Sequence, residues 1–192
     1  YLNIKKEIAN KFNFSLERKN DDFGFIISPY YKRINGFIQL IPTGITTTIK
    51  GAFPVWEYDQ VDAQIFGIDI DINKKINSQL DYLGNISLIK GENITQDIPL
   101  IHMPSTNFSN RIVYTNKQWH DLTFSLRNTT VLRQNDYPNY NFNTFNPTTQ
   151  QEVFVDISSP TPAYSLFDFS ASATLKTSHK GSLKLEFNIE NI

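Results

Sequence analysis

The chain has 192 residues, of which 40% are hydrophobic and 14% aromatic, and its 18 Lys and Arg nearly balance 19 Asp and Glu. Balanced charge argues against a nucleic-acid partner, and the absence of cysteine excludes disulfides and thiolate metal sites. No apolar run reaches the roughly 18 residues of a transmembrane helix, so we expect no membrane insertion. Because the chain begins with Tyr1 and its single methionine is Met103, we expect it to be cut from, or part of, a longer protein.

Residues 1–12 are the one segment with a helical spacing of hydrophobic residues. Ile4, Ile8 and Phe12 recur every four residues, which predicts a short helix. A helix of this length is unstable alone and has to dock on another surface. It either covers the sheet of its own domain or serves as an N-terminal arm on a neighbouring subunit. Residues 13–192 are then a single domain.

From Asn13 onward the hydrophobic pattern has a period of two, which is typical of strands. Turn residues divide the next part of the chain: Ser28-Pro29 and Pro42-Thr43-Gly44 each close a strand, and Gly51 and Pro54 precede another. The predicted short strands are residues 23–27, 36–41, 45–50 and 55–58.

Residues 64–73 show the longest clean alternation, with isoleucine on one face and Asp69 and Asp71 on the other. Two neighbouring carboxylates could form a catalytic pair or bind calcium. The glycine that a calcium-binding loop needs is absent, since Lys74 and Lys75 follow. A solvated strand face is the simpler interpretation, and we predict no metal and no cofactor.

Residues 110–128 predict a β-hairpin with a short polar connection. Its second strand alternates strictly, so Leu122, Phe124 and Leu126 are expected in the core and Thr123 and Ser125 on the opposite face. The strands expected after it are residues 153–157, 164–169, 171–176 and 182–189.

Residues 133–151 form a long irregular segment in which aromatic side chains alternate with asparagine, proline and threonine. Long ordered loops on β scaffolds often carry binding residues. Aromatic rings beside amides suit a sugar-binding surface or a protein interface, although they could also fold back onto their own domain. The candidate interaction residues are Tyr137, Tyr140, Phe142, Phe145, Ile4 and Ile8.

The regular spacing of short strands and turns predicts an all-β, antiparallel β-sandwich. Long excursions at residues 81–104 and 133–151 favour an eight-stranded jelly roll with at most the one N-terminal helix. The sequence has no nucleophile elbow, no phosphate-binding glycine loop and no zinc spacing of its three histidines. We therefore expect no enzymatic activity and no catalytic residues.

The runs that begin at Asn110, Trp119 and Glu152 resemble the later strands of viral jelly-roll proteins of the minor capsid or vertex type, over residues 110–157. Residues 126–130 lack the glycine of that family's turn. The resemblance implies a virion structural protein of a capsid, vertex or tail-attachment assembly. Its partners would be copies of itself and neighbouring virion proteins. The alternative is an extracellular or cell-surface carbohydrate-binding or adhesin module, with glycans as partners.

Overall fold

The computed structural model describes residues 4–48, 51–158, 160–176 and 181–192, and all regular structure in these ranges is β-strand. The strands are β1 Ile8–Asn13, β2 Leu16–Lys19, β3 Phe23–Thr48, β4 Gly51–Lys75, β5 Leu80–Asn93, β6 Ile98–Pro99, β7 Asn107–Asn116, β8 Leu122–Val131, β9 Phe142–Asn146, β10 Gln151–Val155, β11 Tyr164–Lys176 and β12 Ser182–Ile189.

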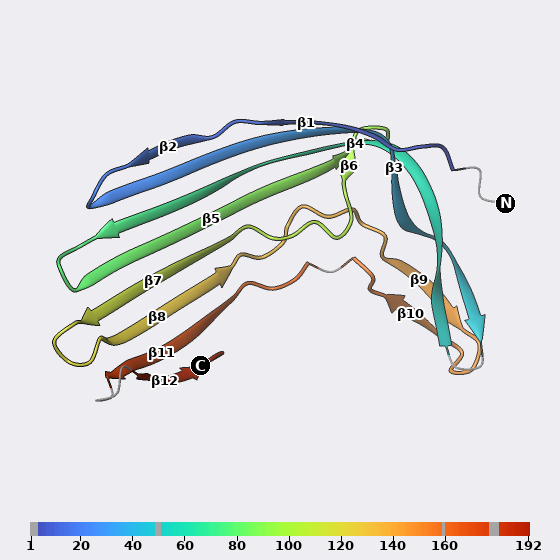
Figure 1. Cartoon of the computed structure of the whole chain (residues 1–192). Helices are drawn as coiled ribbons and strands as arrows, with labels where there is room; N and C mark the ends of the chain where they lie inside the picture. Colours follow the sequence, from blue (N-terminus) through green and yellow to red (C-terminus); the bar gives the residue numbers. More distant parts are fainter. Residues whose placement is uncertain (1–3, 49–50, 159, 177–180) are drawn as a thin grey trace.

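One curved antiparallel sheet dominates the structure (Figure 1). Its order is β1-β3-β4-β5-β7-β8-β11-β12, with β2 beside β3 and β6 beside β5, while β9 and β10 pair separately. The predicted all-β antiparallel class is confirmed. The predicted jelly roll is wrong, because a jelly roll needs two packed sheets and these strands pair with their sequence neighbours in one layer.

The helix predicted for residues 1–12 is also wrong, because Ile8–Asn13 form β1 along the edge of β3. A spacing of four residues is an even number, so it places side chains on one face of a strand as well as on one face of a helix. Ile8 and Phe12 do lie on the same face, opposite Asn35 and Tyr31 of β3.

Strands β3 and β4 are far longer than the predicted short strands, with 26 and 25 residues. Proline removes one backbone donor and is tolerated at a strand edge or bulge. Pro29 faces the break between β1 and β2, where its carbonyl accepts from the Phe14 N–H at 3.1 Å. Pro42 lies at a register shift against β4. The prolines therefore mark interruptions in the neighbouring strand rather than the end of their own.

The two faces of the sheet differ in chemistry. Residues directly opposite one another in an antiparallel pair point to the same side, so rows can be followed across the strands. What we call the apolar face carries Phe12, Leu16, Phe25, Ile27, Phe66, Ile68, Ile70, Ile72, Ile86, Leu88, Phe108, Ile112, Phe124, Leu126, Phe167, Phe169, Leu185 and Phe187. The polar face carries Asp69, Asp71, Asn73, Asn85, Ser87, Ser109, Arg111, Thr123, Ser125, Arg127, Thr129, Asp168, Ser170, Ser172, Lys184 and Glu186.

The predicted alternation of β8 is correct, but its burial is the reverse of the prediction. Phe124 and Leu126 are 38% and 48% exposed, whereas Ser125 is only 4% exposed. Ser125 accepts a hydrogen bond from the Nε of Arg111 on β7 at 2.6 Å. The apolar face of the sheet is therefore turned outward, and its polar side chains contact one another on the other side.

The two ends of the sheet also differ. At one end, the turn end, the connections are short: residues 20–22, 76–79 and 117–121. At the other, the loop end, strands are joined by residues 94–106, which include β6, and by residues 132–163, which include the β9–β10 hairpin. Strands β3 and β4 continue past the end of β5 and turn away from the rest of the sheet (Figure 1). We call this part, residues 37–48 and 51–62, the arm.

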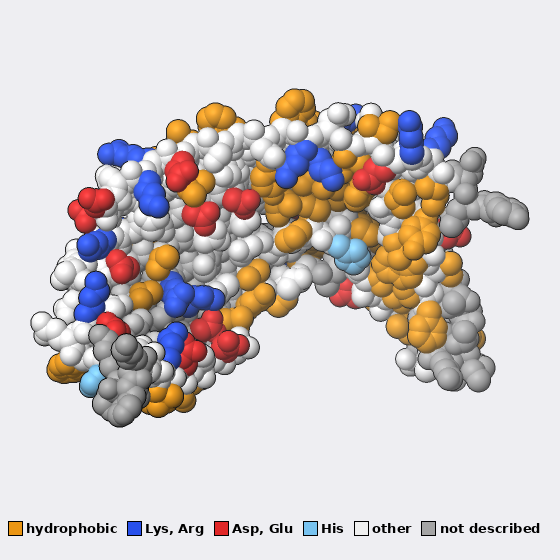
Figure 2. Space-filling model, viewed as in Figure 1, with side chains coloured by type: hydrophobic (Ala, Val, Ile, Leu, Met, Phe, Trp, Pro, Cys, Tyr) orange, Lys and Arg blue, Asp and Glu red, His pale blue; other side chains and the backbone are white. Residues whose placement is uncertain are grey.

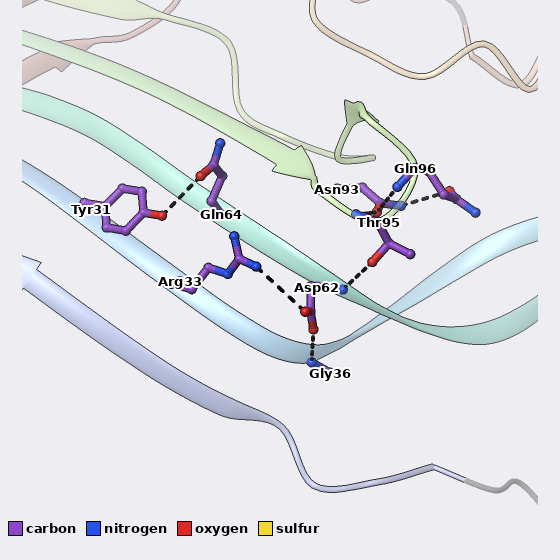
Figure 3. Close-up of polar contacts among 8 residues, drawn as sticks. All are labelled: Tyr31, Arg33, Gly36, Asp62, Gln64, Asn93, Thr95 and Gln96. Atoms are coloured by element: carbon purple, nitrogen blue, oxygen red, sulfur yellow. Dashed lines mark hydrogen bonds and ion pairs between the residues drawn. The ribbon is translucent and has the colours of Figure 1, made fainter.

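A bulge at Gly36 starts the arm (Figure 3). Gly36 has a φ of +68°, which a side chain disfavours, and its N–H donates to Asp62 Oδ1 at 3.1 Å. A guanidinium nitrogen of Arg33 lies 3.8 Å from the same carboxylate. The Asp62 N–H donates to Thr95 Oγ1 at 2.9 Å, which ties the bulge to the connection after β5. These contacts fix the bend in place.

Gly36→Ala is expected to destabilise the protein by about 1–2 kcal/mol, because an L side chain disfavours the left-handed conformation by that amount. Its Cβ would also lie only 3.3 Å from Gln60 Nε2 and from the Lys6 carbonyl oxygen. Denaturant unfolding measures the change. Gly36→Asn is the control and should cost less, because asparagine tolerates this conformation. Equal stability of Gly36→Ala and wild type would contradict the role given to this bulge.

The only buried apolar cluster among the described residues lies at the loop end, where residues 94–106 fold onto the polar face. Ile34, Ala63 and Leu100 are almost fully buried there, with Phe37, Ile65 and Met103 packed around them. Leu100 is held by its N–H, which donates to the Gly91 carbonyl at 2.9 Å. This small core gives the loop end a defined structure.

Candidate functional site

A cavity of about 140 Å³ lies at the loop end, bounded by three separate segments of the chain. The arm contributes Trp56, the connection after β5 contributes His102, and the connection after β8 contributes Tyr137 and Tyr140. β5 pairs with β4 only from Ala63 to Lys75, so residues 51–62 of β4 have no β5 partner. The β9–β10 hairpin lies beside the arm (Figure 1). Figure 2 shows hydrophobic side chains gathered over this region, whereas charged side chains are spread over the strands of the sheet.

Side-chain amides brace the segment that carries the two tyrosines. Gln134 Nε2 donates to the carbonyls of Met103 and Pro104, at 2.9 and 3.2 Å. Asn141 Oδ1 accepts from the backbone N–H groups of Ile157 and Ser158, at 2.8 and 2.7 Å. The Gln134 contacts join the two connections of the loop end. The Asn141 contacts join the part of the longer connection before β9 to the part after β10. The aromatic wall of the cavity is therefore ordered.

Asn141→Ala is expected to loosen the longer connection, because two partly buried backbone donors lose their acceptor, at a cost of about 1–3 kcal/mol. Hydrogen exchange of the Ile157 and Ser158 amides should become about tenfold faster or more. Asn139→Ala is the matched control, since its Oδ1 accepts only the exposed Asn141 N–H at 3.1 Å. If both variants exchange at the wild-type rate, Asn141 does not hold the two parts of the longer connection together.

Electrostatics at this site centre on Tyr140 and Asp136. Burial, and then the negative charge of Asp59, raises the pKa of Tyr140 above its ordinary value, so its hydroxyl stays protonated near neutral pH. Asp136 pairs with Lys90 of β5 at 2.9 Å, but both side chains are exposed, so the pair adds little stability. The cavity thus offers aromatic rings, neutral hydroxyl and amide groups, and one carboxylate.

Two of the predicted interaction residues are brought together at this site, and four are not. Tyr137 and Tyr140 line the cavity. Phe142 and Phe145 lie in β9 on opposite faces, with Phe145 exposed. Ile8 begins the edge strand β1 and Ile4 precedes it, and both are exposed rather than part of the cavity lining. A role in interactions stays a prediction for all six.

Sequence reasoning did not select Trp56, His102 or Gln134. Trp56 is part of a strand pattern, and His102 precedes Met103-Pro104, so neither has a local signal of binding. Each lines the cavity only because the arm and the two connections converge.

Asp69 and Asp71 lie on the polar face, as the strand interpretation predicted. Asp69 accepts from Ser87 Oγ at 2.7 Å and Asp71 from Asn85 Nδ2 at 2.8 Å. No group of three or more His, Asp or Glu in the described ranges could hold a metal ion. The same ranges contain no helix long and apolar enough to cross a membrane.

Comparison with known proteins identifies the family. A family model described as "TonB dependent receptor-like, beta-barrel" matches residues 1–192. The chain belongs to this family. Among solved structures, 34 chains match, and one is the copper transporter OprC, with 16% identity and a TM-score of 0.78. That match covers 100% of this chain and 26% of OprC, so the chain spans about a quarter of its length. No curated protein matches.

Family membership corrects the functional predictions. The resemblance of residues 110–157 to viral jelly-roll proteins is wrong, and so are the virion location and the partners in a virion. The alternative of an extracellular carbohydrate-binding or adhesin module is wrong for the same reason. The predicted absence of membrane insertion is overturned, because TonB-dependent receptor barrels are membrane proteins. Alternating strands occur in both kinds of protein, so the pattern could not separate them.

Proposed function

We propose that this chain forms part of the wall of an outer-membrane, TonB-dependent receptor that takes up a substrate, and that it acts as a transporter rather than an enzyme. The apolar face contacts lipid and the polar face lines the interior of the barrel. The observation that carries the proposal is the division of one sheet into two chemically different faces. Transmembrane barrels alternate apolar residues outward and polar residues inward.

The height of the apolar face fits a membrane. On β4 it extends over residues 65–73, between Gln64 and Lys74, and a tilted strand crosses a bilayer in about 9–11 residues. Just beyond this band lies a row of polar contacts. Tyr31 donates to Gln64 at 3.1 Å, and Gln64 donates to Glu92 at 2.5 Å. This polar belt suits the level of the lipid headgroups.

The connections supply an orientation. Bacterial barrels have short turns on the periplasmic side and longer loops on the extracellular side. The turn end is then periplasmic, and the loop end with its cavity faces outward, where a substrate arrives first. Tyr137, Tyr140 and Trp56 are accordingly proposed to contact the substrate as it enters.

Closure of the barrel needs strands beyond those described. Among the described residues, β12 pairs only with β11, and β1 and β2 pair only with β3. An open edge cannot remain in the hydrocarbon core, because its backbone groups would be unsatisfied. Large outer-membrane transporters have about 22 strands, so further strands would complete the wall.

Single-cysteine labelling tests the insertion and its orientation, since the chain itself has no cysteine. Thr149→Cys lies between β9 and β10, and Lys117→Cys lies in the turn between β7 and β8. In intact cells that express the receptor without other cysteines, a membrane-impermeant maleimide should label only Thr149→Cys. Lys117→Cys should react after the outer membrane is permeabilised. Equal labelling of both sites in intact cells would disprove the proposed orientation.

A further inference from the structure

Strand β5 lacks a strand neighbour over a short stretch near the loop end. β7 pairs with it only from Leu80 to Ser87, and β6 pairs only with Glu92 and Asn93. Within the described residues, no strand pairs with positions 88–91 on that edge. The strand ladder is therefore interrupted there, and the Gly91 carbonyl accepts instead from the Leu100 N–H at 2.9 Å.

A cavity of about 610 Å³ occupies this place. Ile68 and Leu88 of the apolar face contribute to its lining, and so does Tyr30 of the polar face. Its other side is the segment that follows β8, residues 132–136, which we call the strap. Because residues of both faces bound the cavity, it reaches into the plane of the sheet rather than lying on one surface.

The rim of the cavity carries positive charge. Lys90 lies opposite Phe66, in the outermost row of the apolar band, and pairs with Asp136 of the strap. Arg133, also in the strap, has no ion pair or hydrogen bond within the described residues. One free guanidinium thus lies beside an apolar cavity.

We propose that this cavity binds a membrane lipid with an anionic phosphate headgroup. The acyl chain lies against Ile68 and Leu88, and the phosphate accepts hydrogen bonds from Arg133. Guanidinium groups match phosphate geometry well, and such charge-assisted hydrogen bonds are stronger than neutral ones. This inference rests on the proposed function, because it takes the apolar face as the lipid-facing side.

Native mass spectrometry of the detergent-purified receptor tests the site. The probes are phosphatidylglycerol and phosphatidylcholine with identical acyl chains, added separately. Wild type should retain phosphatidylglycerol at least fivefold more than phosphatidylcholine, and Arg133→Gln should lower that retention about tenfold, the effect of losing a hydrogen bond to a charged group. Leu88→Trp should fill the cavity and reduce retention of both lipids.

Arg127→Gln is the matched control. Arg127 is also an exposed arginine, but it lies on the polar face of β8, so retention should stay at the wild-type level. Equal retention of the two lipids, or undiminished retention by Arg133→Gln, would overturn the lipid site. The cysteine labelling described above separates the two proposals: correct labelling with unselective lipid retention refutes the lipid site alone, and failed labelling refutes both.

Discussion

Ile70→Arg is expected to destabilise the membrane-inserted receptor by about 2–4 kcal/mol, the cost of an arginine near the middle of the bilayer on the outer face of a barrel. Ile70 lies near the centre of residues 65–73, and its row continues through Ile27, Ile86 and Phe108. Urea titration of the receptor folded into phospholipid vesicles measures the change.

Thr129→Arg is the matched control for this substitution. Thr129 lies one row away on the polar face, in line with Asp71, Asn85 and Ser109. An added guanidinium there faces polar side chains of the neighbouring strands, so we expect a change below about 1 kcal/mol. A neutral Ile70→Arg combined with a costly Thr129→Arg would show that the two faces have been assigned the wrong way round.

Gly67→Val is expected to cost about 3 kcal/mol or more, at the upper end of what overpacking costs in a tightly packed site. A Cβ at Gly67 would collide with the carbonyl oxygen of Leu88 and with the ring and hydroxyl of Tyr30. The first contact is backbone of the adjoining strand, which cannot move without breaking the pairing of β4 with β5. Denaturant unfolding of the receptor reports the loss.

Gly44→Val controls for the general effect of replacing a strand glycine by a β-branched residue. Gly44 also lies in a long strand, but nothing lies within 4 Å of the Cβ it would gain. Its replacement should leave stability within about 0.5 kcal/mol of wild type or raise it slightly. Equal losses at both positions would mean that the close approach of Tyr30 and Leu88 is not what requires glycine at position 67.

Much of the local structure follows from the sequence alone. Strict alternation in residues 64–73 and 122–126 predicts strands, and the structure has them in β4 and β8. Period-two patterns are reliable because successive strand side chains always point to opposite faces. The composition of residues 133–151 also selected Tyr137 and Tyr140, which do line a cavity.

The lengths of the strands could be determined only from the tertiary structure. The sequence predicted strand ends at Pro29 and Pro42, yet both prolines lie inside β3. Pro29 lacks a backbone donor where the edge strand is interrupted, and Pro42 lies at a register shift against β4. The local sequence does not show whether the neighbouring strand is interrupted beside a proline. The cavity at the loop end depends likewise on convergence, since Trp56, His102 and Tyr140 come from three separate segments.

Which face of the sheet is enclosed was also decided only by the tertiary structure. The sequence determined that Leu122, Phe124 and Leu126 share one face and Thr123 and Ser125 the other. The same alternation serves a sandwich, whose apolar face packs inward, and a membrane barrel, whose apolar face turns outward to lipid. Ser125 is buried against Arg111 while Phe124 is exposed, because the strands form one curved layer instead of two packed ones.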